Sequence, residues 1–163
     1  MVIQIDTKEK ARAIKKIISF FDEKQIEHIS SKLYVGDYMN FDNPRLIIDR
    51  KQNLSEVYSN LCPNRKNNPR DENGLLRIDR EVKRANQYGI KLIFLVEHGG
   101  GIKKLDDVKA WQNPQLKKSP YAWNGETLYK HMFMFSKKYD VEFVFCDKRN
   151  TGKRIAELLA VSK

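Results

Sequence analysis

Apolar and polar residues alternate or cluster differently from one segment of the chain to the next. The alternation typical of a β-strand marks residues 2–6, 27–38 and 45–51. A near-continuous apolar run predicts a strand buried on both faces at residues 91–97, and one further strand is predicted at 141–146. Helices are predicted over residues 8–24, 53–61, 75–88, 105–111, 125–139 and 151–159. Strands that alternate with helices predict an α/β fold with a mixed sheet flanked by helices.

The predicted strands 27–38 and 45–51 are joined by a turn signal at residues 41–44, Phe-Asp-Asn-Pro. Asp37 and Asp49 each lie 6 residues from Asn43, because 43 − 37 and 49 − 43 are equal. If the strands pair antiparallel about that centre, the two carboxylates lie opposite one another, with Cβ atoms roughly 5 Å apart. Such a pair is repulsive without a cation, and Mg²⁺ prefers oxygen ligands of this kind.

Three more side chains are predicted to lie near this carboxylate pair. Lys51 lies two residues after Asp49, so both side chains face one side of the strand and Arg50 faces the other. Asp6 ends the first strand, and Glu9 follows at the start of the first helix. Taken singly, these acids also fit a plain turn, an ion-paired strand end or a helix cap. Their combination favours an acidic pocket with one lysine.

The net charge of +10 is unevenly distributed. Residues 1–61 carry 10 basic and 9 acidic side chains, a net of +1. Residues 62–102 carry 8 and 5, a net of +3, and residues 103–163 carry 13 and 7, a net of +6. A basic surface around an acidic centre fits a protein that binds the phosphate backbone of nucleic acid. A solvated, lysine-rich surface is the alternative.

Composition excludes several other classes of protein. Hydrophobic residues make up 40% of the 163 residues, too many for a disordered chain. The longest clean apolar run, residues 92–96, is far shorter than a membrane span. No signal peptide opens the chain, and two cysteines are too few for a disulfide framework. We therefore expect a cytoplasmic protein that does not bind a membrane.

Three short motifs resemble the nuclease domain of the XPF-type family, which are structure-specific endonucleases of the restriction-endonuclease-like superfamily. The motifs are Ile-Asp-Thr-Lys-Glu at 5–9, Val-Gly-Asp-Tyr at 35–38 and Ile-Asp-Arg-Lys at 48–51. The resemblance covers about residues 2–97. It implies a restriction-endonuclease-like mixed β-sheet and cleavage of branched DNA (flaps, forks or junctions) in repair or recombination. It also implies a Mg²⁺ cofactor, for which Mn²⁺ can substitute.

Carried over to this chain, the resemblance implies that Asp37 and Asp49 bind the metal and that Lys51 is the catalytic lysine. Asp6, as a further metal ligand, and Glu9 complete the acidic cluster. Asp49 stands where eukaryotic members usually have Glu. Ser55 stands where they have a downstream acid, with Glu56 one residue later.

Residues 103–163 do not resemble the helix-hairpin-helix region that usually follows the nuclease domain in this family. Compact phage and bacterial relatives are therefore the closer analogy, and the resemblance implies that the protein acts in a bacterial or phage-infected cell. We expect a single nuclease domain over 1–163, with a catalytic core at about 2–97 and an α/β extension at 98–163, and a homodimer is possible.

Without that region, the chain must bind DNA through its own basic segments. The expected contacts are Arg50, Arg65, Lys66, Arg70, Arg77, Arg80 and Arg84. A solvated helix face is the alternative for the last three. Glu81 lies among them, and an ion pair with Arg77 or Arg84 is favoured over a role in the site. The alternative functions are a Holliday-junction resolvase and a non-catalytic DNA-binding module.

Overall fold

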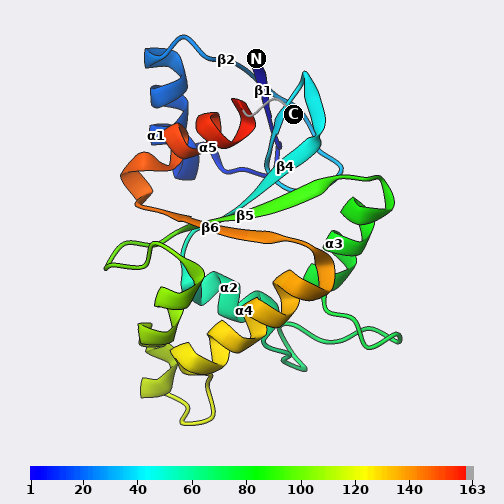
Figure 1. The fold of residues 1–163 in the computed structure, drawn as a ribbon, viewed down its shortest axis with the longest axis vertical. Helices are drawn as coiled ribbons and strands as arrows, with labels where there is room; N and C mark the ends of the chain where they lie inside the picture. Colours follow the sequence, from blue (N-terminus) through cyan, green and yellow to red (C-terminus); the bar gives the residue numbers. More distant parts are fainter. Residues whose placement is uncertain (161–163) are drawn as a thin grey trace.

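A six-stranded mixed sheet forms the centre of the molecule in the computed structural model, which describes residues 1–160 (Figure 1). The strands are β1 (Val2–Ile5), β2 (Glu27–Ser30), β3 (Tyr38–Asn40), β4 (Asn43–Lys51), β5 (Lys91–Glu97) and β6 (Glu142–Cys146). Their order across the sheet is β2-β1-β3-β4-β5-β6. Strand β3 pairs antiparallel with both β1 and β4, and all other neighbours are parallel.

Helices cover both faces of the sheet (Figure 1). One face is covered by α1 (Ala11–Glu23) and α5 (Thr151–Ala160), which pack on each other. The other is covered by α2 (Leu54–Leu61), α3 (Arg77–Gln87) and α4 (Gly125–Tyr139). Short 3₁₀ helices lie at Leu105–Ala110, Pro114–Lys117 and Lys148–Asn150. Within residues 1–160, no helix is both long and apolar enough to cross a membrane.

Successive residues of the central strands contribute to two separate apolar cores. Ile48 on β4 packs into the core beneath α1 and α5, whereas Ile47 packs into the core beneath α2, α3 and α4. On β5, Leu95 packs into the core beneath α1 and α5, and Phe94 packs into the core beneath α2, α3 and α4. This alternation follows from the two-residue period of a strand. It places the residues after Ile48 on alternate faces of the sheet.

The structure confirms the predicted α/β class and the mixed sheet flanked by helices. It also confirms the predicted helix at Gly125–Tyr139 and the buried strand at Lys91–Glu97. The single strand predicted at 27–38 is wrong, because β2 ends at Ser30, residues 31–37 form no regular element, and β3 begins at Tyr38. The helix predicted at 105–111 is a 3₁₀ helix.

Strands β3 and β4 pair in the predicted register at the end near the site, but not at the tip of the hairpin. Tyr38 pairs with Ile48 and Met39 with Ile47, both symmetric about residue 43. The register then shifts between Met39 and Asn40, so that Asn40 pairs with Asn43. Residues 44–46 of β4 therefore have no partner on β3 at this irregularity. Because it lies beyond Met39, it leaves the end that carries Asp37 and Asp49 in the predicted alignment.

Gly36 allows the chain to approach β4 closely just before Asp37. Its φ of +66° lies in the left-handed region, and an added Cβ would lie 2.5 Å from Cγ2 of Ile47. A side chain is therefore excluded both by backbone conformation and by space. The backbone N–H of Asp37 donates to the carbonyl of Ile48 at 2.8 Å. Glycine at position 36 thus brings the Asp37 backbone against β4.

Candidate active site

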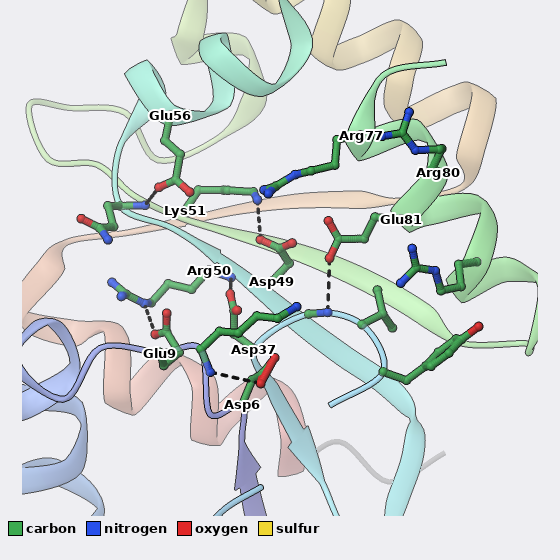
Figure 2. A pocket seen from close by; sticks show the side chains of 16 residues that line it. Asp6, Glu9, Asp37, Asp49, Arg50, Lys51, Glu56, Arg77, Arg80 and Glu81 are labelled. Carbon is green, nitrogen blue, oxygen red and sulfur yellow. Dashed lines mark hydrogen bonds and ion pairs between the residues drawn. The ribbon is translucent and has the colours of Figure 1, made fainter. Parts of the chain in front are cut away.

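A polar pocket of about 320 Å³ lies where β4 ends and α3 passes over the sheet (Figure 2). Its lining includes the acids Asp6, Glu9, Asp37, Asp49, Glu56 and Glu81, together with Lys51, Arg77, Arg80 and Arg84. These residues come from the loop between β1 and α1, the loop before β3, and from β4, α2 and α3. The fold therefore brings all five predicted catalytic residues, Asp6, Glu9, Asp37, Asp49 and Lys51, into one pocket.

Asp37 and Asp49 are held at the inner wall of this pocket. Oδ2 of Asp37 accepts a 2.7 Å hydrogen bond from the backbone N–H of Arg50. Burial, and then the negative charges of Asp49 and Glu9, raise the pKa of Asp37 well above its ordinary value. Burial also raises the pKa of Asp49 to about 6, although Lys51 opposes the shift. The environment of half-buried Asp37 and of buried Asp49 thus disfavours their charged forms, which a nearby cation would offset.

Lys51 lies beside this pair as a buried cation. Its Nζ is 2.7 Å from Oδ1 of Asp49 and 5.4 Å from the centre of the Phe94 ring. Burial lowers the pKa of Lys51, but the charge and hydrogen bond of Asp49 outweigh it, so that its pKa is raised overall. The ammonium therefore stays protonated at neutral pH. It can donate hydrogen bonds and stabilise negative charge, and it cannot act as a base.

Arg50 lies on the other face of the sheet, as strand alternation predicts. Its Nε donates to Oε2 of Glu9 at 2.9 Å, and its Nη1 donates to Oε1 of Glu97 at 3.0 Å. Oε2 of Glu9 also accepts from the Tyr38 hydroxyl at 2.7 Å. The Arg50 side chain is only 2% exposed. This burial contradicts the predicted DNA contact of Arg50, and we assign it a structural role that holds Glu9 at the rim of the site.

Asp6 lies beside Asp37, but its carboxylate binds neighbouring residues of its own loop, whereas the prediction made it a metal ligand. The Asp6 backbone N–H donates to the carbonyl of Asp37 at 2.8 Å. Its Oδ1 accepts from the Lys8 N–H at 3.2 Å and the Thr7 hydroxyl at 3.3 Å, which fits a cap at the start of a turn. Among residues 1–160, no group of three or more His, Cys, Asp or Glu side chains is close enough to hold a metal ion. The predicted three-ligand set of Asp37, Asp49 and Asp6 is therefore not formed.

A divalent ion held by Asp37 and Asp49 alone fits the site. Mg²⁺ commonly binds through one or two carboxylates, with waters and a substrate phosphate completing its shell. Burial, and then repulsion from Asp49 and Glu9, raise the pKa of Asp37, and a bound cation would offset that repulsion. The pocket also has the room and the polar walls that a hydrated ion and a phosphate require.

Two acids outside the predicted set face the pocket. Oε1 of Glu81 accepts a hydrogen bond from the Gly36 N–H at 3.4 Å (Figure 2). No ion pair joins Glu81 to Arg77 or Arg84 in the described part of the chain, so the favoured intrahelical pairing is wrong. Glu56 accepts from the Gln52 N–H at 2.7 Å. The helical spacing of residues 77, 81 and 84 was the available signal for Glu81, because all three share one face of α3.

The predicted basic residues divide into two groups. Arg77, Arg80 and Arg84 on α3 line the same pocket as the acids. Arg80 also pairs with Asp71 at 3.1 Å. By contrast, Arg65, Lys66 and Arg70 are exposed on the connection between α2 and α3, outside the pocket lining. The structure thus brings the helix arginines, but not the loop residues, to the acidic centre.

Nearly the whole chain, including the residues of the pocket, matches a known family. Residues 5–158 match the ERCC4 domain. The chain belongs to the ERCC4 domain family. The match includes all six acids of the pocket, Lys51 and the whole of α3. No curated protein matches this ERCC4 domain in sequence.

Solved structures support the fold of this ERCC4 domain. XPF from Aeropyrum pernix is similar with a TM-score of 0.63 at 15% identity, covering 98% of this chain and 63% of that one. A second structure, XPF from Aeropyrum pernix in complex with DNA, has a TM-score of 0.60 at 17% identity, covering 97% and 62%. The present chain thus spans about three-fifths of the length of these relatives. Together with the family match, they confirm the resemblance to the XPF-type nuclease fold.

Proposed function

We propose that this ERCC4 domain is a divalent-metal-dependent endonuclease that hydrolyses phosphodiester bonds in branched or otherwise structured DNA. The observation that carries the proposal is the single pocket that combines Asp37, Asp49 and Lys51 with the arginines of α3. Family membership and the likeness to an XPF bound to DNA support it. Mg²⁺ is the proposed cofactor, with Mn²⁺ as a substitute.

The side chains of the pocket have separate tasks in this proposal. Asp37 and Asp49 would hold the metal, which when bound supplies positive charge against the phosphodiester in the transition state. The Lys51 ammonium, fixed by Asp49, donates hydrogen bonds to an attacking water or a phosphate oxygen. Arg77, Arg80 and Arg84 hold the DNA backbone across the mouth of the pocket. Glu81, bound to the Gly36 N–H, keeps α3 and the loop before Asp37 together.

The direct test is cleavage of labelled flap, fork and four-way-junction DNA. We expect cutting with Mg²⁺ or Mn²⁺ and none when the metal is removed with EDTA, because the two carboxylates alone repel the phosphate. The length of the products, read on a denaturing gel, gives the site of the cut. Binding without metal-dependent cutting of any substrate would contradict the proposal and favour a DNA-binding module. Symmetrical nicking of the four-way junction would instead identify a resolvase.

The arginines of α3 are expected to contribute more to DNA binding than those of the preceding loop. Replacing Arg77 with Gln removes a phosphate contact at the pocket, which reduces the slope of log affinity against log salt by about 1. Replacing Arg65 with Gln, outside the pocket, is the matched control and should change the slope less. Fluorescence anisotropy of labelled fork DNA at several salt concentrations measures both. If Arg65→Gln changes the slope as much or more, DNA is bound mainly by the loop and not by the arginines at the pocket.

A homodimer and a cytoplasmic location remain predictions from the sequence and its resemblance. The homodimer is tested by measuring the molar mass of the protein by size-exclusion chromatography with light scattering, with and without junction DNA.

A further inference from the structure

We propose that Tyr34 and Tyr88 form a stacking site for an unpaired DNA base beside the cleavage centre. The inference rests on the proposed function and narrows it to substrates with an unpaired nucleotide next to the cut. Neither tyrosine belongs to the motifs identified in the sequence. Tyr34 lies in the irregular segment between β2 and β3, and Tyr88 directly follows α3.

The two rings form an exposed aromatic pair. Their centroids are 5.1 Å apart at an interplanar angle of 83°, an edge-to-face arrangement. Tyr34 is 56% exposed and Tyr88 is 60% exposed. Each ring therefore supports the other while leaving a large part of its surface open. Apolar surface of this kind is stabilised when another flat ring covers it.

The positively charged side chain of Arg84 lies against the tyrosine pair. The Arg84 guanidinium carbon lies 5.5 Å from the centre of the Tyr34 ring. Arg84 also lines the acidic pocket, so one arginine joins the aromatic pair to the phosphate-facing wall of the site. Aromatic rings beside basic side chains are the usual means by which proteins hold single-stranded nucleic acid, since rings stack on bases while cations bind the backbone.

The position of Tyr34 relates this pair to the reacting phosphate. Tyr34 lines the pocket itself and precedes Asp37 by 3 residues. Three residues of chain span at most about 10 Å, or about three stacked nucleotides at roughly 3.4 Å each. Because Tyr34 and Asp37 also line the same pocket, a base on Tyr34 lies within a few nucleotides of the cut. The exposed rings of Phe41 and Tyr121 lie outside the pocket lining and lack this relation.

The occupant that fits best is an unpaired base rather than a base pair. In a duplex the faces of a base are covered by its neighbours, so an edge-to-face tyrosine pair finds no open ring to stack on. In a flap or fork, the first unpaired nucleotides at the branch expose theirs. The tyrosine pair is therefore expected to favour a branch point in DNA over continuous duplex.

Binding of fork DNA that carries 2-aminopurine at each of the first three unpaired positions tests this proposal. In EDTA buffer, which prevents cutting, the parent protein should quench 2-aminopurine fluorescence at one of these positions. Tyr34→Leu should lose the quenching and bind the fork roughly 5- to 150-fold more weakly. Tyr34→Phe, which keeps the ring, should retain both. Tyr121→Leu, at a ring that is 92% exposed but outside the pocket, is the control for loss of a surface tyrosine.

A second measurement separates this site from the chemistry. With Mg²⁺, Tyr34→Leu should raise KM for the fork more than it lowers kcat, and affinity for unbranched duplex should not change. The stacking proposal is wrong if Tyr34→Leu quenches 2-aminopurine as strongly as the parent does. It is also wrong if the parent quenches at none of the three positions. If the fork is still cut in either case, the proposed nuclease function stands. If no DNA is cut but quenching depends on Tyr34, the nuclease proposal fails alone.

Discussion

Asp37→Asn is expected to abolish cleavage and to make the metal-free protein more stable. Asparagine keeps an oxygen that accepts the 2.7 Å hydrogen bond from the Arg50 N–H, so the local backbone is retained. It removes a buried charge that Asp49 and Glu9 repel. Loss of one proposed metal ligand costs several kcal/mol of transition-state stabilisation, a rate loss on the order of 10³-fold. Removal of the repelled charge is therefore expected to stabilise the metal-free fold.

The gain in stability should depend on pH. The folded-state pKa values of Asp37 and Asp49 lie above the ordinary value of 3.8, and that of Asp49 reaches about 6. The folded state therefore binds these protons more tightly, and the stability they contribute is lost as pH rises through the folded-state pKa values. Because Asn does not titrate, the difference between Asp37→Asn and the parent should widen from about pH 4 to about pH 8.

Thermal denaturation in EDTA at several pH values measures the difference, and Asp42→Asn on the exposed turn is the control. Adding Mg²⁺ or Mn²⁺ should raise the melting temperature of the parent more than that of Asp37→Asn. Unchanged cleavage by Asp37→Asn, or a variant less stable than the parent at about pH 8, would contradict the assignment of Asp37.

Arg50→Met is expected to cause the largest loss of stability of any single change at this site. Arg50 separates two carboxylates, Glu9 and Glu97, and the Glu97 side chain is only 2% exposed. Oε2 of Glu97 already has no hydrogen-bond partner within the described residues. Without Arg50, its Oε1 would lose its partner too. Removing one partner of a buried ion pair typically costs about 3–5 kcal/mol, a fall in melting temperature on the order of 10 °C.

The double variant Arg50→Met with Glu97→Gln distinguishes this cause from loss of packing. It removes the unpaired buried charge, so it should be more stable than Arg50→Met alone. Arg12→Met on the exposed face of α1 is the matched control and should change the free energy of unfolding by less than about 0.5 kcal/mol. Chemical denaturation in urea measures all three. If Arg50→Met is as stable as Arg12→Met, the buried ion pair does not stabilise the fold.

Local patterns in the sequence were sufficient to place the centre of the candidate site. The symmetric spacing about Asn43 predicted that Asp37 and Asp49 would meet, and the pairing of Tyr38 with Ile48 confirms the alignment. The strand period predicted that Arg50 would face away from Lys51, which the structure also confirms. Both predictions depend on one hairpin, whose geometry is encoded within about fifteen residues.

Features that depend on distant segments could not be predicted in this way. The Arg50–Glu97 pair requires the parallel pairing of β4 with β5, which no local pattern specifies. Glu81 turned toward Gly36 rather than toward its neighbours on α3, because the position of that helix over the sheet decides its partner. The strand predicted over the irregular segment 31–37 is wrong because alternation of apolar and polar residues does not by itself provide a partner strand, and these residues pair with no neighbour in a regular ladder.

The register shift between Met39 and Asn40 separates the tip of the hairpin from the end that carries the site. Insertions or deletions at the tip, residues 41–44, should therefore leave the alignment of Asp37 with β4 intact. A single residue added between Ile48 and Asp49 would instead exchange the two faces of the strand. Arg50 would then take the place of Lys51 in the acidic pocket, and Asp49 would take the place of Arg50 beside Glu9 and Glu97. Natural variation in this hairpin should therefore be confined to its tip.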